Sequence, residues 1–314
     1  MQIGARAARQ AVGVAIIAFL AACSDGDGGT STGTSATQLS TQENAGPTSS
    51  GDVASDGLAW INYRRTQAGL QTVTREAQLD RAAAAHAAYQ QLNNLITHDE
   101  DPSRPGFTGV TATERLRAAG YPLDTQAQAD GEVIAATAEA DGFAAAEGLL
   151  GAIYHRYLML EPRFDLAGAG DAHRGGGYYW LNVNFVASRS SAGQLAGRVV
   201  VWPLPDQRSV RTRVSSDQET PDPVAGRDTV GYPVSVHAPL GTRLLVSRFT
   251  IREQGGQVAL KTAQLDSSSD RDTPPSAAAI IPLTRLRSGV LHEVEFAGSV
   301  DGVPVERRWS FTTR

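Results

Sequence analysis

The spacing of apolar residues divides the chain into a helical first part and a strand-rich second part. Between residues 55 and 157, apolar side chains recur at intervals of three and four, which is the period of an amphipathic helix. The pattern predicts four helices, over residues 56–69, 75–95, 111–120 and 142–157. The second helix is rich in alanine, which favours close packing against a neighbouring element.

Capping residues and one alternating strand support this division. Ser55 or Asp56 is expected to cap the first helix, Thr111 with Glu114 forms a capping-box pattern, and Asp141 precedes the fourth helix. The strand follows the helices and is apolar on one whole face, as expected of a sheet packed on helices. That face carries Tyr179, Leu181, Val183 and Phe185, and the other carries Trp180, Asn182, Asn184 and Val186.

Short apolar runs separated by Pro, Gly and Asp dominate the chain after residue 187. They predict strands over residues 198–202, 234–236, 244–251, 258–260, 279–282, 290–296 and 308–312. Short strands at such spacing are typical of a β-sandwich. Residues 231–237, 301–302 and 309–313 are similar to bacterial immunoglobulin-like modules. We therefore predict an α+β protein whose residues 195–314 form an all-β, immunoglobulin-like sandwich.

The amino terminus has the pattern of an export signal. Arg6 and Arg9 precede an apolar run over residues 11–20 that is too short to span a bilayer. The run leads through Leu20-Ala21-Ala22 into Cys23, the only cysteine, and this arrangement resembles the lipobox of bacterial lipoproteins. The resemblance implies that residues 1–22 are a lipoprotein signal peptide and that Cys23 is acylated. The protein is then anchored to the membrane of a bacterial cell envelope, in the periplasm or at the cell surface.

Composition indicates how the segment after Cys23 behaves and which partners and metal ligands are not expected. Residues 23–50 contain almost no large apolar side chains and predict a disordered tether. Ser24 is compatible with sorting to the outer membrane of a Gram-negative envelope. The net charge of −5 does not suggest a nucleic-acid partner. Because Cys23 is used for lipid, no disulfide and no cysteine metal ligand is expected.

Most catalytic signatures are absent from the sequence. It contains no His-Glu-x-x-His helix, no Gly-x-Ser-x-Gly turn, no phosphate-binding loop and no dinucleotide fingerprint. The adjacent residues of the run His98-Asp99-Glu100-Asp101 do not converge on a metal without a special loop. The remaining candidates are His and Glu residues of the helical part: His86, His98, Glu114, Glu132, Glu139, Glu147 and His155. Glu114 is interpreted as the capping partner of Thr111, and His86 as a residue between helices.

Short motifs in residues 51–190 follow the order found in the CAP superfamily, which comprises cysteine-rich secretory proteins, antigen 5 and pathogenesis-related 1 proteins. The chain resembles that family in residues 62–70, 79–87, 97–98, 117–121, 131–132, 154–156 and 164–170, and in the strand around Trp180. The resemblance implies a three-layer α-β-α sandwich for residues 51–190, with an antiparallel sheet between helices.

Members of the CAP superfamily share a cleft lined by two His and two Glu. The resemblance implies that His98, Glu132 and His155 line this cleft, and Glu147, on the helix before His155, is the candidate for the fourth position. Two imidazoles and a carboxylate facing one cavity can hold Zn²⁺ with an open position, so His98 and His155 are candidate metal ligands. The sequence departs from the family at Val133, where Asn is usual, and over residues 149–154.

Three functions are consistent with these features. The leading hypothesis is a non-enzymatic envelope lipoprotein whose CAP domain presents a His/Glu cleft to a lipid, cell-wall, metal or protein ligand, with the second domain as a spacer or adhesion module. The alternative enzyme is a Zn²⁺-dependent hydrolase of cell-wall or other envelope polymers, with Glu132 as general base. The third hypothesis is a surface adhesion or structural module with a vestigial cleft.

Overall fold

The computed structural model describes residues 17–19, 46–175, 177–190 and 199–314. Cys23, the tether as far as residue 45 and most of the predicted signal peptide lie outside the described residues. Within the described part of the chain, no helix is both long enough and apolar enough to cross a membrane.

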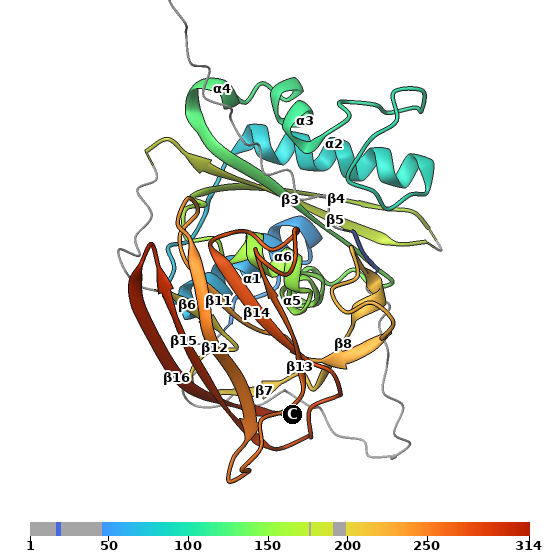
Figure 1. The fold of residues 1–314 in the computed structure, drawn as a ribbon. Coiled ribbons are helices and arrows are strands. Elements are labelled where there is room, and N and C mark those ends of the chain that lie inside the picture. Colours follow the sequence, from blue (N-terminus) through green and yellow to red (C-terminus); the bar gives the residue numbers. More distant parts are fainter. Residues whose placement is uncertain (1–16, 20–45, 176, 191–198) are drawn as a thin grey trace, which may run out of the picture.

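A mixed sheet lies at the centre of the first part (Figure 1). In spatial order it contains β2 (Thr74–Arg75), β4 (Leu166–His173), β5 (Tyr179–Ser188), β3 (Ala127–Thr137), β1 (Ile17–Phe19) and β9 (Glu219–Thr220). The three long strands β4, β5 and β3 pair antiparallel, as the family resemblance implies. β1 is parallel to β3 and antiparallel to β9, and β2 is parallel to β4.

Helices cover both faces of this sheet (Figure 1). On one face lie α2 (Ala77–Asn93), α3 (Ala112–Ala118) and α4 (Leu123–Gln126). On the other face lie α1 (Val53–Gln67), α5 (Gly142–Gly151) and α6 (Ile153–Met159). The predicted α+β class is confirmed, and the helices and sheet are stacked in three layers.

Local capping explains where the helices begin. Asp141 accepts a hydrogen bond from the Ala144 N–H at 2.9 Å and caps α5, and Thr111 accepts from the Glu114 N–H and caps α3, as predicted. The first helix begins earlier than predicted, because Asp52 caps it.

The predicted helix over residues 142–157 is in fact two helices. The chain leaves the helical conformation at Ala152, whose ψ is 127°, and α6 starts at the next residue. The new start is stabilised by Glu219, whose two carboxylate oxygens accept hydrogen bonds from the N–H groups of Ile153 and Tyr154 at 3.0 and 2.7 Å. An acidic side chain at a helix N-terminus satisfies backbone donors and interacts favourably with the helix dipole.

Two glycines on β4 allow α2 to lie directly on the sheet. A Cβ atom at Gly168 would lie 2.2 Å from the backbone nitrogen of Asp80, and one at Gly170 would lie 2.1 Å from that of Ala84. Both positions therefore exclude any side chain, which accounts for the Gly-x-Gly spacing in the sequence.

Two four-stranded sheets form most of the second part. One has the order β13 (Thr262–Asp266), β14 (Ala277–Pro282), β11 (Val234–His237), β6 (Val200–Trp202). The other has the order β12 (Leu244–Glu253), β15 (Leu291–Val300), β16 (Val303–Thr313), β7 (Gln207–Val210). All pairs are antiparallel except β16 with β7. A smaller sheet pairs β8 (Arg213–Ser215) with β10 (Thr229–Gly231), and a 3-10 turn at Ser216–Gln218 leads into β9.

The strand predicted over residues 258–260 is wrong. Those residues are irregular, Val258 is 80% exposed, and the strand forms later as β13, where Leu265 is buried and the chain pairs with β14. Burial of Leu265 and the hydrogen-bonded pairing of β13 with β14 favour the later strand over the short apolar run at residues 258–260. The other predicted strands each overlap an observed strand.

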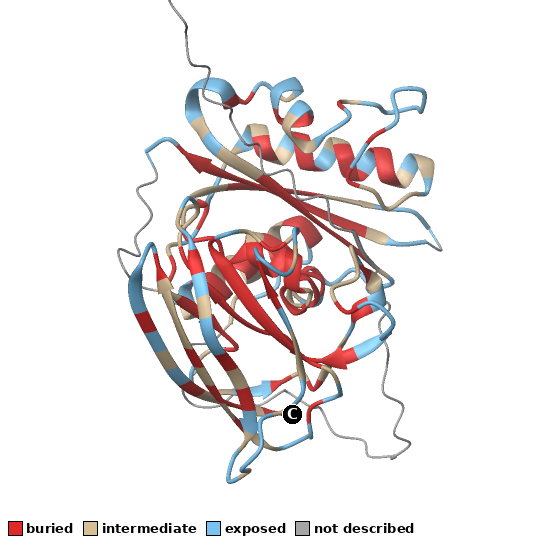
Figure 2. Ribbon diagram, viewed as in Figure 1, coloured by how far each residue is buried: buried red, intermediate tan, exposed pale blue. Residues whose placement is uncertain are grey.

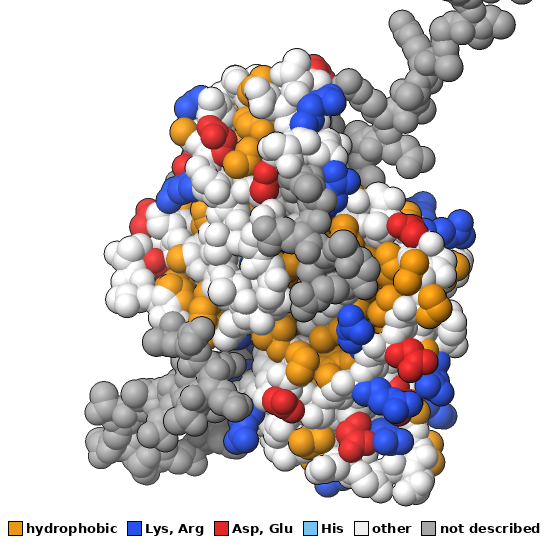
Figure 3. Space-filling view, turned by 90° about the vertical axis from the view of Figure 1, so that its left-hand side faces the viewer, with side chains coloured by type: hydrophobic (Ala, Val, Ile, Leu, Met, Phe, Trp, Pro, Cys, Tyr) orange, Lys and Arg blue, Asp and Glu red, His pale blue; other side chains and the backbone are white. Residues whose placement is uncertain are grey.

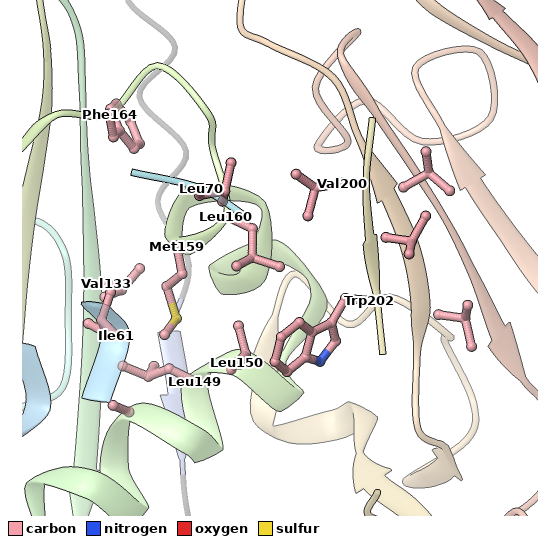
Figure 4. Close-up of a cluster of buried hydrophobic side chains, with 14 of the residues drawn as sticks. Ile61, Leu70, Val133, Leu149, Leu150, Met159, Leu160, Phe164, Val200 and Trp202 are labelled. Carbon is pink, nitrogen blue, oxygen red and sulfur yellow. The ribbon is translucent and has the colours of Figure 1, made fainter. Parts of the chain in front are cut away.

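The two parts of the chain share one hydrophobic core. Figure 2 shows that α1, α5 and α6, buried between the central sheet and the C-terminal sheets, are largely inaccessible to solvent. One cluster of buried side chains contains Ile61 and Leu150 from this helical layer together with Trp202 and Val200 from β6 (Figure 4). The same cluster continues to Phe311 between the two C-terminal sheets.

Charged side chains of both signs intermingle on the C-terminal part. In Figure 3 acidic and basic groups alternate over the lower half of the molecule, where the C-terminal sheets lie. Arg252 pairs with Glu293 at 2.8 Å, and Arg308 pairs with Glu295 at 3.5 Å. These exposed pairs contribute little stability, but the mixture of signs leaves no strongly basic or acidic face in this view.

Candidate functional site

A buried carboxylate, Glu132 on β3, is the centre of a polar network on the α2 face of the sheet. Its Oε1 lies 2.9 Å from Nδ1 of His98, and both its oxygens accept hydrogen bonds from Nη2 of Arg115, at 2.8 and 2.9 Å. Burial by itself raises the pKa of this carboxyl, but the charge of Arg115 and the contacts with His86 and His98 hold the pKa of Glu132 well below its usual range. Glu132 is therefore ionised, and its oxygens accept hydrogen bonds from other buried side chains of the protein.

His98 presents one ring nitrogen that the protein leaves unused. Because a carboxylate can only accept, Nδ1 of His98 carries the proton that Glu132 receives. Burial lowers the pKa of His98, and nearby His155 and His86 lower it further, although Glu132 opposes this. The ring is thus neutral near pH 7, with Nε2 as an acceptor. Nε2 is buried and has no hydrogen-bond partner among the described residues.

A second layer of buried groups supports the first. The ring nitrogens of His86 lie 2.8 Å from Glu100 Oε1 and 2.8 Å from the Thr97 carbonyl oxygen. Glu100 also accepts a hydrogen bond from the Thr108 N–H at 2.6 Å. Burial by itself raises the pKa of Glu100, but these hydrogen bonds outweigh it, so that the pKa is lowered. His86 thus lies between α2 and the following loop, rather than between two helices as interpreted from the sequence, and holds that loop beside His98.

The run His98-Asp99-Glu100-Asp101 alternates between inside and outside. His98 and Glu100 are 6% and 2% exposed, whereas Asp99 and Asp101 face solvent. Every second side chain of this loop therefore points toward the protein interior. This alternation is the signal that would have assigned Glu100 to the site. Arg115, in the helix capped by Thr111, gave no signal of its own.

The second histidine is positioned by the C-terminal part of the chain. His155 is fully buried on α6, and its Nδ1 lies 3.4 Å from Oε1 of Glu219, the residue that caps this helix. His155 is one of the groups that lower the pKa of His98, which indicates that the two histidines are within electrostatic range of each other. Glu219 reaches α6 because β9 and its flanking turns, between β7 and β11, extend from the C-terminal sheets to the edge of the central sheet.

Glu147 is not brought to the histidines. It accepts hydrogen bonds from Trp60 Nε1 at 2.8 Å and from Arg64 Nε at 2.9 Å, and so joins α5 to α1. The carboxylate beside His155 comes instead from Glu219. Two of the remaining candidates have local roles: Glu114 accepts from the Val110 N–H at the start of α3, and Glu139 lies in an exposed turn.

Two buried amides lie next to Glu132 on the same face of the sheet. Asn184 is directly opposite Glu132 in the β3–β5 ladder, and Asn182 is opposite Ile134. Both are fully buried, and neither the nitrogen nor the oxygen of either side chain has a hydrogen-bond partner in the described part of the protein. The site therefore contains more hydrogen-bonding capacity than its own residues satisfy.

The donor set does not fit a three-ligand zinc site. Among the residues that the structure describes, no group of three or more His, Cys, Asp or Glu side chains could hold a metal ion. A catalytic zinc needs three protein ligands and one open position. Glu132 already accepts hydrogen bonds from Arg115 and His98 with both of its oxygens.

Comparison with known proteins agrees with the predicted family. Residues 58–187 match the model of the cysteine-rich secretory protein family, CAP. No match was found among curated proteins.

Two solved structures resemble part of the chain. An extracellular protein containing an SCP domain from Bacillus anthracis is 26% identical, with a TM-score of 0.36, and the match covers 45% of this chain and 45% of that one. An outer surface protein from Borrelia burgdorferi is 17% identical, with a TM-score of 0.36, over 42% of this chain and 90% of that one. The match thus spans less than half the length of the Bacillus anthracis protein.

Proposed function

We propose that the protein, whose residues 58–187 match the CAP family model, is a non-enzymatic envelope lipoprotein that binds a ligand at His98 and His155. The observation that carries this proposal is the buried Nε2 of His98, which has no hydrogen-bond partner in the described part of the chain. Leaving a buried polar atom unpaired costs about 1–3 kcal/mol. A ligand that donates a hydrogen bond to Nε2 removes that penalty.

The network behind His98 fixes its ring for binding. The ionised Glu132 holds the proton on Nδ1 and keeps the Nε2 lone pair directed away from the network. Arg115 in turn holds Glu132, and all three side chains are buried. A site whose side chains are fixed before binding loses little conformational entropy when a ligand enters.

The same network argues against acid–base chemistry at Glu132. A general base needs a pKa near the working pH, whereas the pKa of Glu132 is far below its usual range. His98 contacts no hydroxyl nucleophile, because Nδ1 is bonded to Glu132 and Nε2 meets no partner among the described residues. These contacts favour binding over hydrolysis.

Anchoring through Cys23 places this site outside the cytoplasm. The basic start, the short apolar run and the position of Cys23 support export and acylation. Ser24 favours the outer membrane if the envelope is Gram-negative. Metabolic labelling with a palmitate analogue is expected to mark the wild-type protein and not Cys23→Ser, and the variant is expected to leave the membrane fraction. Labelling of both proteins would refute lipidation at Cys23.

The C-terminal sheets are interpreted as an immunoglobulin-like spacer. Counted in chain order with β6 and β7 as one divided first strand, β11 to β16 are the second to seventh strands. One sheet then contains the first, second, fifth and fourth strands (β6, β11, β14 and β13), and the other contains the third, sixth and seventh (β12, β15 and β16), followed by β7. This is the arrangement of constant-type immunoglobulin sandwiches, if β6 and β7 are counted as one divided first strand. The shared core with α1, α5 and α6 supports a rigid spacer.

Binding to the cell envelope tests the proposed site. All buried apolar residues in the described part of the mature chain lie between Val53 and Phe311, so a fluorescent chain beginning at Ser24 keeps its cores. We expect it to be retained on purified envelopes of the source bacterium, and His98→Ala to weaken retention about tenfold, since one buried hydrogen bond is lost. His173→Ala, at an exposed histidine, is the matched control. Equal retention of all three proteins would remove His98 from the ligand site.

A further inference from the structure

β1 occupies a position between two strand edges that come from distant parts of the chain. Ala18 is paired with Ala135 of β3 on one side and with Glu219 of β9 on the other. β3 runs parallel to β1 and β9 runs antiparallel to it. In Figure 1 this strand is the short dark-blue segment at the end of the central sheet. It is the sole link between β3 and β9 in the described sheet.

The predicted signal peptide contains β1, so cleavage before Cys23 removes it from the mature protein. The backbone N–H and C=O groups of β3 and β9 that face β1 then lose their partners. On its other side β3 pairs with β5 along its length, and in the described part of the chain its outer edge pairs only with β1. Removal of β1 therefore leaves two edges facing one vacant strand position.

The outer edge of β3 has the character of an interior strand. All residues from 131 to 136 are buried, and the stretch contains no Pro, Lys or Arg. Permanent sheet edges are normally protected by such residues or by bulges, because a bare edge recruits other strands. The only irregularity of β3 is a register shift near Ala127, far from the β1 position. This edge is thus suited to being covered.

The vacant position leads directly to the candidate site. Because β1 is parallel to β3, an occupant of this position that extends further toward its own N-terminus would run alongside Ile134, Val133 and Glu132. At about 3.3 Å per residue, a residue three positions earlier lies level with Glu132. On the opposite edge, Glu219 caps α6 and contacts His155. An extended chain in this position therefore passes between β3, whose Glu132 bonds His98, and β9, whose Glu219 contacts His155.

We propose that the mature protein binds an extended, apolar polypeptide segment of a partner protein as an added strand between β3 and β9. This inference rests on the proposed function and specifies the ligand of the same site. Main-chain hydrogen bonds to both edges provide the affinity, as in other cases of strand addition. The small side chains of Ala135 and Ala136 suit an occupant such as the Ile-Ala-Phe sequence of β1. Where the segment runs level with Glu132, beyond the two residues of β9, we expect it to donate a hydrogen bond to Nε2 of His98, which has no partner among the described residues.

A synthetic peptide tests this directly. The probe has the sequence of residues 13–22, with two added lysines for solubility and a fluorescein label, and is titrated into the chain beginning at Ser24. We expect saturable binding, and at least about tenfold weaker binding when Ala18 of the peptide is replaced by proline, which removes an N–H and cannot sit between two strands. A peptide with a benzophenone side chain in place of Phe19 is expected to cross-link to β3 and β9.

Each alternative outcome has a distinct meaning. Equal binding of the two peptides, or cross-links confined to other elements, would overturn the strand-addition proposal. His98-dependent retention on envelopes without binding of either peptide would also overturn it, but would leave the ligand site intact. Failure of both the peptide and the envelope assay would overturn the two proposals together.

Discussion

The carboxylate of Glu219 accepts a hydrogen bond from the backbone N–H of Tyr154, 65 residues earlier in the chain. This contact joins the C-terminal part of the protein to the helix that carries His155. It also explains why α5 and α6 are separate helices, because the capped N–H groups belong to a new first turn. The candidate site is therefore assembled from both parts of the chain.

Removal of the Glu219 carboxylate should destabilise the protein. In Glu219→Ala the N–H groups of Ile153 and Tyr154 lose their acceptor in a buried position, and we expect a loss of about 1–3 kcal/mol in the free energy of unfolding. Glu219→Gln keeps one acceptor oxygen and should lose less. Urea unfolding measures both, with Glu306→Ala, at an exposed glutamate, as the control. A Glu219→Ala protein as stable as this control would refute the capping role.

Disruption of the Arg115–Glu132 pair should be more costly than its complete replacement. Arg115→Leu leaves Glu132 buried without its cation, and such a change typically costs about 3–5 kcal/mol. The double variant Arg115→Leu/Glu132→Leu removes both charges and should recover part of that loss. Denaturant unfolding of Arg115→Leu, Glu132→Leu and the double variant gives the coupling energy between the two side chains. Additive losses would show that the two side chains do not interact energetically.

The stability of the folded protein should depend on pH because of Glu161. Burial raises the pKa of Glu161 to about 7 from the ordinary value of 4.5, although hydrogen bonds from the Leu240 and Arg163 N–H groups oppose this. The folded state then holds a proton that the unfolded state releases, so stability falls as the pH rises from about 4.5 to about 7. The loss over this window is about 3 kcal/mol.

Glu161→Gln is the matched variant for this effect, because it keeps a neutral side chain of the same shape at every pH. Unfolding curves measured at several pH values should show that the wild type loses stability relative to this variant between about pH 4.5 and 7. A constant difference between the two proteins across that window would contradict the raised pKa.

Close contact between α2 and β4 should make Gly168 sensitive to a single methyl group. A Cβ at this position would lie 2.2 Å from the Asp80 nitrogen, so Gly168→Ala must displace the helix and should cost about 1–3 kcal/mol. Gly175→Ala is the control, because a Cβ there meets no atom within 4 Å. Thermal unfolding distinguishes the two, and a Gly168→Ala protein as stable as Gly175→Ala would mean that the helix moves freely.

Much of the fold could be predicted from local sequence patterns. The apolar period, the caps at Thr111 and Asp141 and the alternation of residues 179–186 each depend on neighbours only a few positions away. The break at Ala152 could not be predicted in this way. Its cause is Glu219, which belongs to a segment that reads as part of a separate β domain.

In the candidate site, too, local motifs could be predicted from the sequence and long-range contacts could not. The motif order predicted a CAP domain over residues 51–190, and residues 58–187 match the model of that family. The carboxylate that contacts His155 could not be predicted, because nothing in the sequence distinguishes Glu219 from Glu147. Only the three-dimensional structure shows that Glu147 bonds Trp60 and Arg64, while Glu219 lies beside His155. Long-range contacts of this kind leave no periodic signal.

The most direct test of the account is the NMR spectrum of the His98 ring in ¹⁵N-histidine-labelled protein, before and after addition of solubilised envelope material. Before addition, His98 should be neutral at pH 7.5 with its proton on Nδ1, because burial lowers its pKa and Glu132 accepts from Nδ1. Addition should shift the Nε2 resonance of His98, as its lone pair gains a donor, and leave that of the buried His237 in the C-terminal sheet unchanged. A His98 Nε2 resonance that does not respond would contradict the claim that this nitrogen is the ligand-binding group.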